Sequence, residues 1–354
     1  MATLEPISPD SQLRLLHVGL AGLGKFGCQH ADILADCPGA KLIAVCDIDG
    51  TALERQLKRN GPLRGYHSFD KFINDSQLDA IVIATPEHLH HKHALTAIRK
   101  GYPVFVEKPM ASNLEEAEQL QQASQQANTT LQIGLVLRYE ASHSKLKQEI
   151  ASGSFGEIVS VRVKRNCSRQ WAAFHLDRGH TVYETLIHDL DLMLWLTNSQ
   201  AERVMAIERQ SKTYKNSEAI TALIHFENGT IGVAESSWFI PNGSPLNVTA
   251  GEWQGTIDAE LEVVGTLRTA KLRLLDAPLQ IWSQTCSESI DVGLWPLLQG
   301  SIGGALRREL TDFINCVREH RTSVVASLED AVEGLRIAEA IKSAAATGKI
   351  VWMN

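Results

Sequence analysis

The chain has 354 residues, of which 44% are hydrophobic and 21% are charged, a composition typical of a globular protein of about two domains. Its net charge of −7 gives no support to a nucleic-acid or anionic-membrane partner. The sequence shows neither a secretion signal nor an apolar run of the roughly 18 residues that a membrane span needs. The six cysteines are scattered without a C-x-x-C pair, which indicates free thiols and a cytoplasmic protein.

Residues 1–13 are expected to form a mobile arm, and a strand at 15–20 then leads into a glycine-rich turn. The turn, Gly22-Leu23-Gly24-Lys25-Phe26-Gly27, fits the pattern G-x-G-x-x-G. In this pattern the first glycine allows the tight turn and the second lets the backbone approach a pyrophosphate. The third lets the following helix, expected at 27–36, pack on the strand and point its amides at the phosphates.

Asp47 stands at the end of the next expected strand, 40–47, twenty residues after Gly27. Dinucleotide-binding folds place there the carboxylate that binds the adenosine ribose 2′-OH and repels a 2′-phosphate. We therefore predict NAD as the cofactor. NADP stays open as a second choice, because Lys25 or Arg55 could pair with its extra phosphate.

Short apolar strands and helices alternate up to about residue 136. Further strands are expected at 79–84, 103–106 and 129–136. Helices are expected at 51–59, at 68–74, at 88–100 and, after the capping box Ser112-x-x-Glu115, up to about 127. This alternation predicts a doubly wound parallel sheet of the Rossmann type over residues 14–136.

The pattern changes in the second half, which we assign to an α+β domain over residues 137–354. A helix is expected near 141–151, a polar loop at 166–180 and a helix at 181–196. Short strands are expected at 157–164, 203–208, 219–226, 230–236, 257–264 and 267–275. Two helices close the chain, and the last, at 327–347, could pack back on the first domain. A large, mainly antiparallel open sheet would result, and its uncovered face would be buried in a homodimer or homotetramer.

The order of motifs resembles the Gfo/Idh/MocA family, named for glucose–fructose oxidoreductase and inositol dehydrogenase. The resemblance runs from about residue 14 to 351 and rests on the glycine turn, Thr85-Pro86-Glu87-His88-Leu89-His90, Glu107-Lys108-Pro109 and Glu184-x-x-x-His188. It implies an NAD(P)-dependent dehydrogenase that moves a hydride between nicotinamide and a secondary alcohol or ketone of a cyclitol or sugar. The implied cofactor contacts are Gly22, Gly24, Lys25, Phe26, Gly27, Asp47, Thr85, Pro86, His90, Glu107 and Lys108.

Three residues are the catalytic candidates. Lys108 comes two residues after a buried strand, so it emerges at the sheet edge where such folds bind ligands, and it could donate to the substrate oxygen. The resemblance implies that His188 accepts the hydroxyl proton, with an acid four residues earlier on the same helix face. Glu184 stands where the family commonly has aspartate, and it would orient the histidine or the substrate.

Other polar residues are weaker candidates. Arg138, Trp171 and His175 could contact the substrate, while Asp189 and Asp191 are expected to be structural or to face solvent. The four histidines at 88, 90, 91 and 93 suggest a metal, but no carboxylate or cysteine completes a ligand set, so we predict none. Two alternatives stay open: a regulator that binds dinucleotide and ligand without turnover, and a reductase of a non-sugar such as a linear tetrapyrrole or a dihydrodiol.

Overall fold

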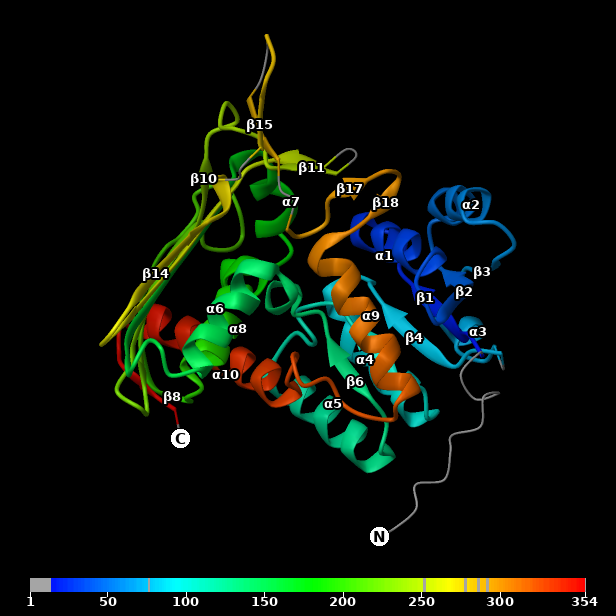
Figure 1. The fold of residues 1–354 in the computed structure, drawn as a ribbon, viewed down its shortest axis with the longest axis horizontal. Coiled ribbons are helices and arrows are strands. Elements are labelled where there is room, and N and C mark those ends of the chain that lie inside the picture. The colour runs from blue at the N-terminus through cyan, green and yellow to red at the C-terminus, as the bar shows by residue number, and fades with distance from the viewer. Residues whose placement is uncertain are drawn as a thin grey trace.

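The computed structural model describes residues 14–75, 77–250, 253–276, 279–284, 287–290 and 293–353. These residues form two large sheets, each with helices, that lie side by side, and three small two-stranded sheets (Figure 1). The arm expected at 1–13 lies outside the described residues. Within the described ranges, no helix combines the length and the apolar character needed to cross a bilayer.

The first sheet has six parallel strands in the order β3-β2-β1-β4-β5-β6, which confirms the expected doubly wound fold. Strand β4 is buried along its whole length, as an apolar run between two helical layers requires. The strands are β1 (Leu16–Ala21), β2 (Ala40–Cys46), β3 (Arg64–Tyr66), β4 (Ala80–Ile83), β5 (Val104–Val106) and β6 (Leu131–Ile133). The helices are α1 (Lys25–Ala35), α2 (Gly50–Arg59), α3 (Phe69–Phe72), α4 (His90–Arg99) and α5 (Leu114–Ala127).

The start of α5 differs from the expected capping box by one residue. Asn113 is the cap, and its Oδ1 accepts a hydrogen bond from the backbone amide of Glu116 at 2.9 Å. The Glu116 carboxylate in turn accepts from the amide of Ser112 at 3.0 Å. The arrangement resembles a capping box, but Glu116 reaches the amide of the residue before the cap and not that of Asn113 itself.

The second sheet has seven strands in the order β14-β13-β7-β10-β9-β8-β19, and only the β7–β10 pair is parallel. The strands are β7 (Ile158–Ser168), β8 (Ala201–Arg209), β9 (Ala219–Phe226), β10 (Ile231–Ile240), β13 (Ile257–Gly265), β14 (Thr269–Arg273) and β19 (Val351–Trp352). Figure 1 shows helices α6 (Ala141–Ala151), α8 (Ile187–Thr197) and α10 (Leu328–Thr347) on the side of this sheet that faces the first domain. Short strand pairs follow β10 and β14: β11 (Val248–Ala250) with β12 (Trp253–Gly255), β15 (Leu279–Trp282) with β16 (Ser287–Ile290), and β17 (Leu297–Leu298) with β18 (Ser301–Ile302).

The last two helices tie the two domains together. Helix α9 (Gly304–Arg318) buries an apolar stripe, and its Phe313 ring meets Phe105 of β5 at a centroid distance of 5.8 Å. Helix α10 is capped by Ser327 and ends at Gly348, as the sequence predicts. It also reaches α5, where Glu339 accepts a hydrogen bond from the amide of Leu114 at 2.8 Å.

The helix expected at 181–196 is not one regular α-helix. Residues Val182–Leu186 form a π-helical turn, in which the amide of Ile187 donates to the carbonyl of Val182, and α8 follows. The Thr185 hydroxyl donates to the Thr181 carbonyl and lies 2.7 Å from the Ser236 hydroxyl on β10. Hydroxyl bonds of this kind widen and bend helices. Such turns often occur at functional sites.

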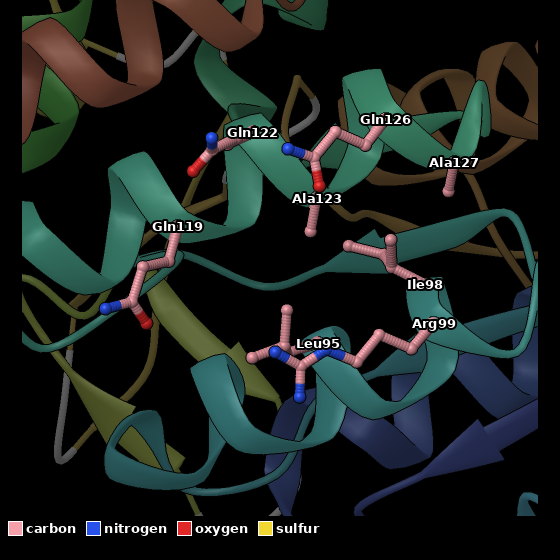
Figure 2. Close-up of a pocket in the computed structure, with 8 residues that line it drawn as sticks. All are labelled: Leu95, Ile98, Arg99, Gln119, Gln122, Ala123, Gln126 and Ala127. Atoms are coloured by element: carbon pink, nitrogen blue, oxygen red, sulfur yellow. The ribbon is translucent and has the colours of Figure 1, made fainter.

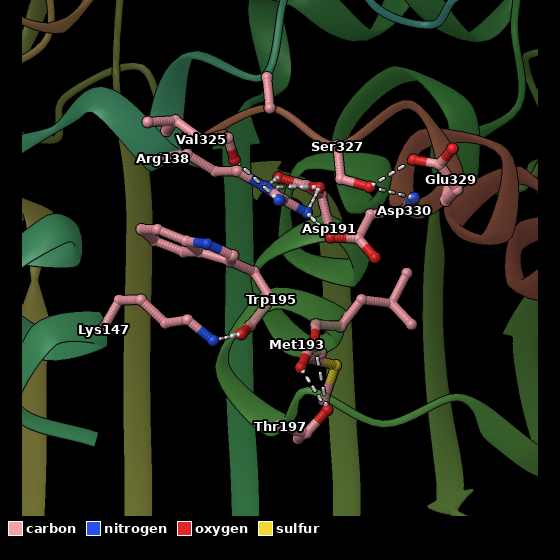
Figure 3. A network of polar contacts seen from close by, with 12 residues as sticks. Arg138, Lys147, Asp191, Met193, Trp195, Thr197, Val325, Ser327, Glu329 and Asp330 are labelled. Carbon is pink, nitrogen blue, oxygen red and sulfur yellow. Dashed lines mark hydrogen bonds and ion pairs between the residues drawn. The ribbon is translucent and has the colours of Figure 1, made fainter. Parts of the chain in front are cut away.

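Arg138 holds the connection between the domains (Figure 3). It lies in the 3₁₀ turn Val136–Tyr139 after β6, and its side chain is only 1% exposed. Its guanidinium pairs with Asp191 of α8 at 2.5 Å and with Asp330 of α10 at 2.8 Å. A third bond goes to the carbonyl of Val325. Arg138 is therefore a buried structural residue, which corrects its expected substrate contact, and Asp191 does not face solvent.

We expect the substitution Arg138→Leu to lower the free energy of unfolding by about 3–5 kcal/mol, because it leaves the buried Asp191 carboxylate without its partner. Urea titration followed by circular dichroism measures this change. The matched control is Arg268→Leu, which removes an exposed arginine paired with Glu149 and should cost at most about 1 kcal/mol. A loss in Arg138→Leu no larger than in the control would contradict this role.

Candidate active site

The glycine turn between β1 and α1 has the shape that a dinucleotide site requires. Gly22 has φ +95°, and a Cβ there would lie 2.3 Å from the carbonyl oxygen of Ala84. A Cβ on Gly27 would lie 2.0 Å from the carbonyl oxygen of Gly22. A Cβ on Gly24, by contrast, would meet nothing within 4 Å. The first and third glycines therefore permit close packing, while the second keeps the backbone open to an approaching pyrophosphate.

The carboxylate of Asp47 lies against this turn. Its Oδ2 accepts a hydrogen bond from the amide of Leu23 at 2.6 Å, and its Oδ1 accepts from the amide of Asp49 at 2.8 Å. This is the position that the ribose-binding acid of an NAD site takes. On the other side of the turn, the ring of Phe26 meets the edge of Trp295 at a centroid distance of 5.6 Å. Lys25 is exposed at the first position of α1.

The histidines after β4 do not act as one group. His90 is 2% exposed, and its two ring nitrogens each lie 2.7 Å from a carbonyl oxygen, of Pro109 and of Thr85. Its ring therefore faces the interior, which corrects the expected contact with nicotinamide, and it ties the Thr85 loop to the Lys108 loop. His93 instead stacks on Phe69. No group of three or more possible metal ligands occurs in the described part of the chain.

Glu107 also points inward. Its Oε1 lies 2.7 Å from Nε2 of His30, a histidine of α1 that is completely buried. Burial raises the pKa of the Glu107 carboxyl, but the hydrogen bond from His30 and the charge of Lys108 outweigh it, so the pKa ends below its ordinary value. The pair fixes the end of β5, from which Lys108 emerges. The sequence reasoning missed His30 because nothing in the local pattern marks its partner.

Lys108 reaches across to the second domain. Its Nζ donates a hydrogen bond to the carbonyl oxygen of Glu184 at 3.0 Å, inside the π-helical turn. His188 follows this turn at the second position of α8. The end of β5 and the start of α8 therefore lie close together, because Lys108 contacts the turn that immediately precedes His188.

The surroundings of His188 favour its neutral form. Burial lowers the pKa of its imidazole well below the ordinary value, and the positive charges of Lys108 and Arg165 lower it further. Arg165 faces inward from β7 and forms a two-bond ion pair with Asp189, at 2.7 and 2.9 Å. Asp189 is therefore structural and buried. The sequence does carry a signal for Arg165, since it occupies an inward position of β7, in alternation with apolar Val161 and Val163.

The hydrogen-bond partner of the Glu184 carboxylate is not the ring of His188. Its Oε2 accepts a hydrogen bond from Nδ1 of His175 at 3.0 Å instead. The expected 166–180 loop contains a 3₁₀ turn (Arg169–Trp171) and the short helix α7 (Ala172–Leu176), which place His175 there. Trp171, the other loop candidate, is 8% exposed and donates to the carbonyl of Gln254 at 3.0 Å. Trp171 thus packs in a small second core, which corrects its expected substrate contact.

The cavity in Figure 2 lies elsewhere. It measures about 310 Å³ and lies between α4 and α5, where Leu95, Arg99 and Gln122 are among the lining residues. None of the candidate catalytic or cofactor residues lines it. The chemistry of the glycine turn, Lys108 and His188 therefore locates the site better than the volume of this cavity does.

Comparisons with known proteins identify the family of the chain. The chain matches the model of an oxidoreductase family with an NAD-binding Rossmann fold over residues 16–135. It matches the C-terminal α/β domain of the same family over residues 147–354. It is 25% identical over 340 residues to scyllo-inositol 2-dehydrogenase (NAD(+)) of Bacillus subtilis strain 168, covering 94% of this chain and 95% of that protein.

Solved structures show the same fold. Myo-inositol 2-dehydrogenase from Lactobacillus plantarum has a TM-score of 0.81 at 22% identity, covering 96% of this chain and 100% of that one. Scyllo-inositol dehydrogenase from Lactobacillus casei, with bound NAD(H) and scyllo-inositol, has a TM-score of 0.77 at 23% identity, covering 96% of this chain and 99% of that one. The chain belongs to this oxidoreductase family, whose first domain is an NAD-binding Rossmann fold and whose second is an α/β domain.

Proposed function

We propose that the protein oxidises a secondary alcohol of a cyclitol or sugar with NAD⁺, or reduces the matching ketone with NADH. The observation that carries the proposal is the hydrogen bond from Lys108 Nζ to the turn before His188, at 3.0 Å. It brings a cation and a neutral base together beside the NAD-binding domain. The inositol dehydrogenases among the relatives support a polyol substrate, and this pair of residues argues against a regulator without turnover.

The proposed chemistry uses three side chains. NAD⁺, when bound at the glycine turn, supplies the hydride acceptor. His188 accepts the hydroxyl proton, a task that its lowered pKa suits because the ring stays neutral at working pH. Lys108 donates a hydrogen bond to the same oxygen and stabilises the negative charge that develops there. Glu184 is held by His175, so we assign its carboxylate to a substrate hydroxyl and not to the His188 ring.

We expect Lys108→Ala and His188→Ala each to lower kcat by about 10²–10⁴-fold, the usual contribution of a positioned acid–base or electrostatic group. A panel of inositols and aldoses with NAD⁺, followed by the absorbance of NADH, identifies the substrate and measures kcat. The affinity for NAD⁺, measured by calorimetry, should stay within a few-fold of the parent protein, since neither side chain belongs to the glycine turn.

Two exposed residues in the segment after β4 serve as matched controls, one in the 3₁₀ turn Glu87–Leu89 and one in α4. His88→Ala and Lys92→Ala remove a histidine and a lysine that the structure places in solvent, and both should retain the parent kcat. Near-normal kcat in Lys108→Ala or His188→Ala would end the assignment for that residue.

We also propose a homodimer or homotetramer built on the outer face of the second sheet. Five large apolar side chains on that face are 47–80% exposed: Met205, Ile207, Leu223, Ile231 and Trp352. They alternate along their strands with buried or partly buried residues, and the helices of this domain cover the opposite face (Figure 1). An exposed apolar area of this kind is typical of an interface, and a second copy would bury it face to face.

The five described cysteines are free, which supports a reducing, cytoplasmic location.

We expect light scattering at micromolar concentration to give the mass of at least two chains. The substitution Ile207→Lys should shift this mass toward one chain, because a lysine would be buried without a partner in the interface. Val324→Lys changes an equally exposed residue in the loop before α10 and should leave the mass unchanged. A single-chain mass for the parent protein would contradict the assembly.

A further inference from the structure

The carboxyl group of Glu184 occupies a space that exists only because residue 179 is glycine. A Cβ at Gly179 would lie 2.2 Å from Glu184 Oε1 and 3.0 Å from its Cγ and Cδ. The backbone conformation at position 179 does not require glycine, because Gly179 is not among the glycines with positive φ. The missing side chain therefore leaves room for a long acidic residue at position 184.

His175 supplies the second support for this carboxyl group. Its Nδ1 lies 3.0 Å from Glu184 Oε2, and its ring stacks on Trp238 with a centroid distance of 4.9 Å and an angle of 28°. Trp238 is only 2% exposed, so the surface on which the imidazole rests is part of the protein interior. The ring of Phe174 also contacts the imidazole, in a T-shaped arrangement with a centroid distance of 5.0 Å. Packing thus fixes the donor before any ligand binds.

The charge on Glu184 is also maintained. Burial raises its pKa, but the hydrogen bond from His175 and the charges of Lys108 and Arg178 outweigh this effect, so the pKa is lowered. Arg178 in turn pairs with Glu87 of the first domain at 3.1 Å. Glu184 therefore presents a fixed carboxylate, 15% exposed, close to the lysine that serves the reacting oxygen.

We propose that His175 and Gly179 are positioning residues that hold this ionised carboxylate as the acceptor for a second hydroxyl of the polyol. This rests on the proposed function. A carboxylate held in place selects for a substrate with a free hydroxyl near the oxidised carbon, and it repels sugars that carry a carboxylate or phosphate there. The loop that carries His175 and Gly179 acts through Glu184 and does not touch the reacting atoms.

A double-mutant cycle that combines substitutions at positions 179 and 184 tests the proposal. We expect Gly179→Ala to lower kcat/KM by about 10- to 100-fold, because the new methyl group displaces the Glu184 carboxylate by an ångström or more. Glu184→Asp shortens the side chain by one methylene and makes room for that methyl group. In the Glu184→Asp background, Gly179→Ala should therefore cause little further loss. Equal losses in both backgrounds, or no loss in the parent background, would overturn the proposal.

A matched pair at position 175 gives a second test that does not depend on the loop backbone. His175→Asn places an amide N–H where Nδ1 now donates, whereas His175→Leu has nearly the same shape and no donor. We expect Asn to keep most of kcat/KM and Leu to lose about tenfold or more, with the loss mainly in KM. Equal activities in the two variants would contradict a positioning role for the hydrogen bond.

NAD⁺ affinity should be unchanged in all these variants, because none of the three positions belongs to the glycine turn. His175→Leu should also lower the melting temperature, because it removes a hydrogen bond from the mostly buried Glu184 carboxylate. The background dependence of Gly179→Ala separates positioning from a loss of stability, because a merely structural effect of that substitution would be the same in both backgrounds. Failure of the proposed function is visible separately. If the proposed function is wrong, the parent protein turns over no substrate of the polyol panel. If only this inference is wrong, the parent oxidises a substrate of the panel, and Gly179→Ala and His175→Leu oxidise it at the parent rate.

Discussion

The site depends on one hydrogen bond between the two domains, from Lys108 Nζ to the carbonyl oxygen of Glu184. Its donor comes from the carboxyl end of β5 in the parallel sheet, and its acceptor lies in the π-helical turn before α8. Doubly wound sheets place functional groups at that end of their strands, and in the proposed function the second domain supplies the base, His188. The distance of 3.0 Å shows that the second domain lies close enough to do so.

Buried ion pairs keep this arrangement in place. Asp189 and Asp191, two residues apart on α8, pair with Arg165 of β7 and Arg138 of the connection between the domains. Both aspartates are at most 3% exposed, so each pair is costly to break, although a buried pair adds little net stability. The pairs instead fix the orientation of α8, and with it His188, relative to both the second sheet and the first domain. Burial and the charges of Lys108 and Arg165 lower the pKa of His188, which favours the neutral ring that the proposed proton acceptor requires.

The sequence alone predicts the parts of the site that depend on local pattern. The glycine turn with Asp47 and the buried strand that precedes Lys108 follow from spacing and apolar periodicity, whereas His188 is singled out only by the family resemblance. The partners of buried polar groups do not. Arg138 meets Asp191 and Asp330, which lie 53 and 192 residues further along the chain, and no local signal predicts that choice. No local signal predicts the partners of His90 and Glu184 either. His90 bonds to backbone carbonyls that only the folded chain brings near it, and Glu184 bonds to His175 on a separate loop.

The pH dependence of kcat/KM tests the central claim, that Lys108 and His188 act on one oxygen, most directly. The acid limb should lie well below pH 6.5, because the His188 pKa is lowered by burial and by the charges of Lys108 and Arg165. Protonation of the base abolishes activity as the pH falls through this value. In Lys108→Met, which removes one of the two charges, the limb of the residual activity should move to higher pH. A limb that stays in place, or a parent limb above pH 6.5, would contradict the convergence of the two residues.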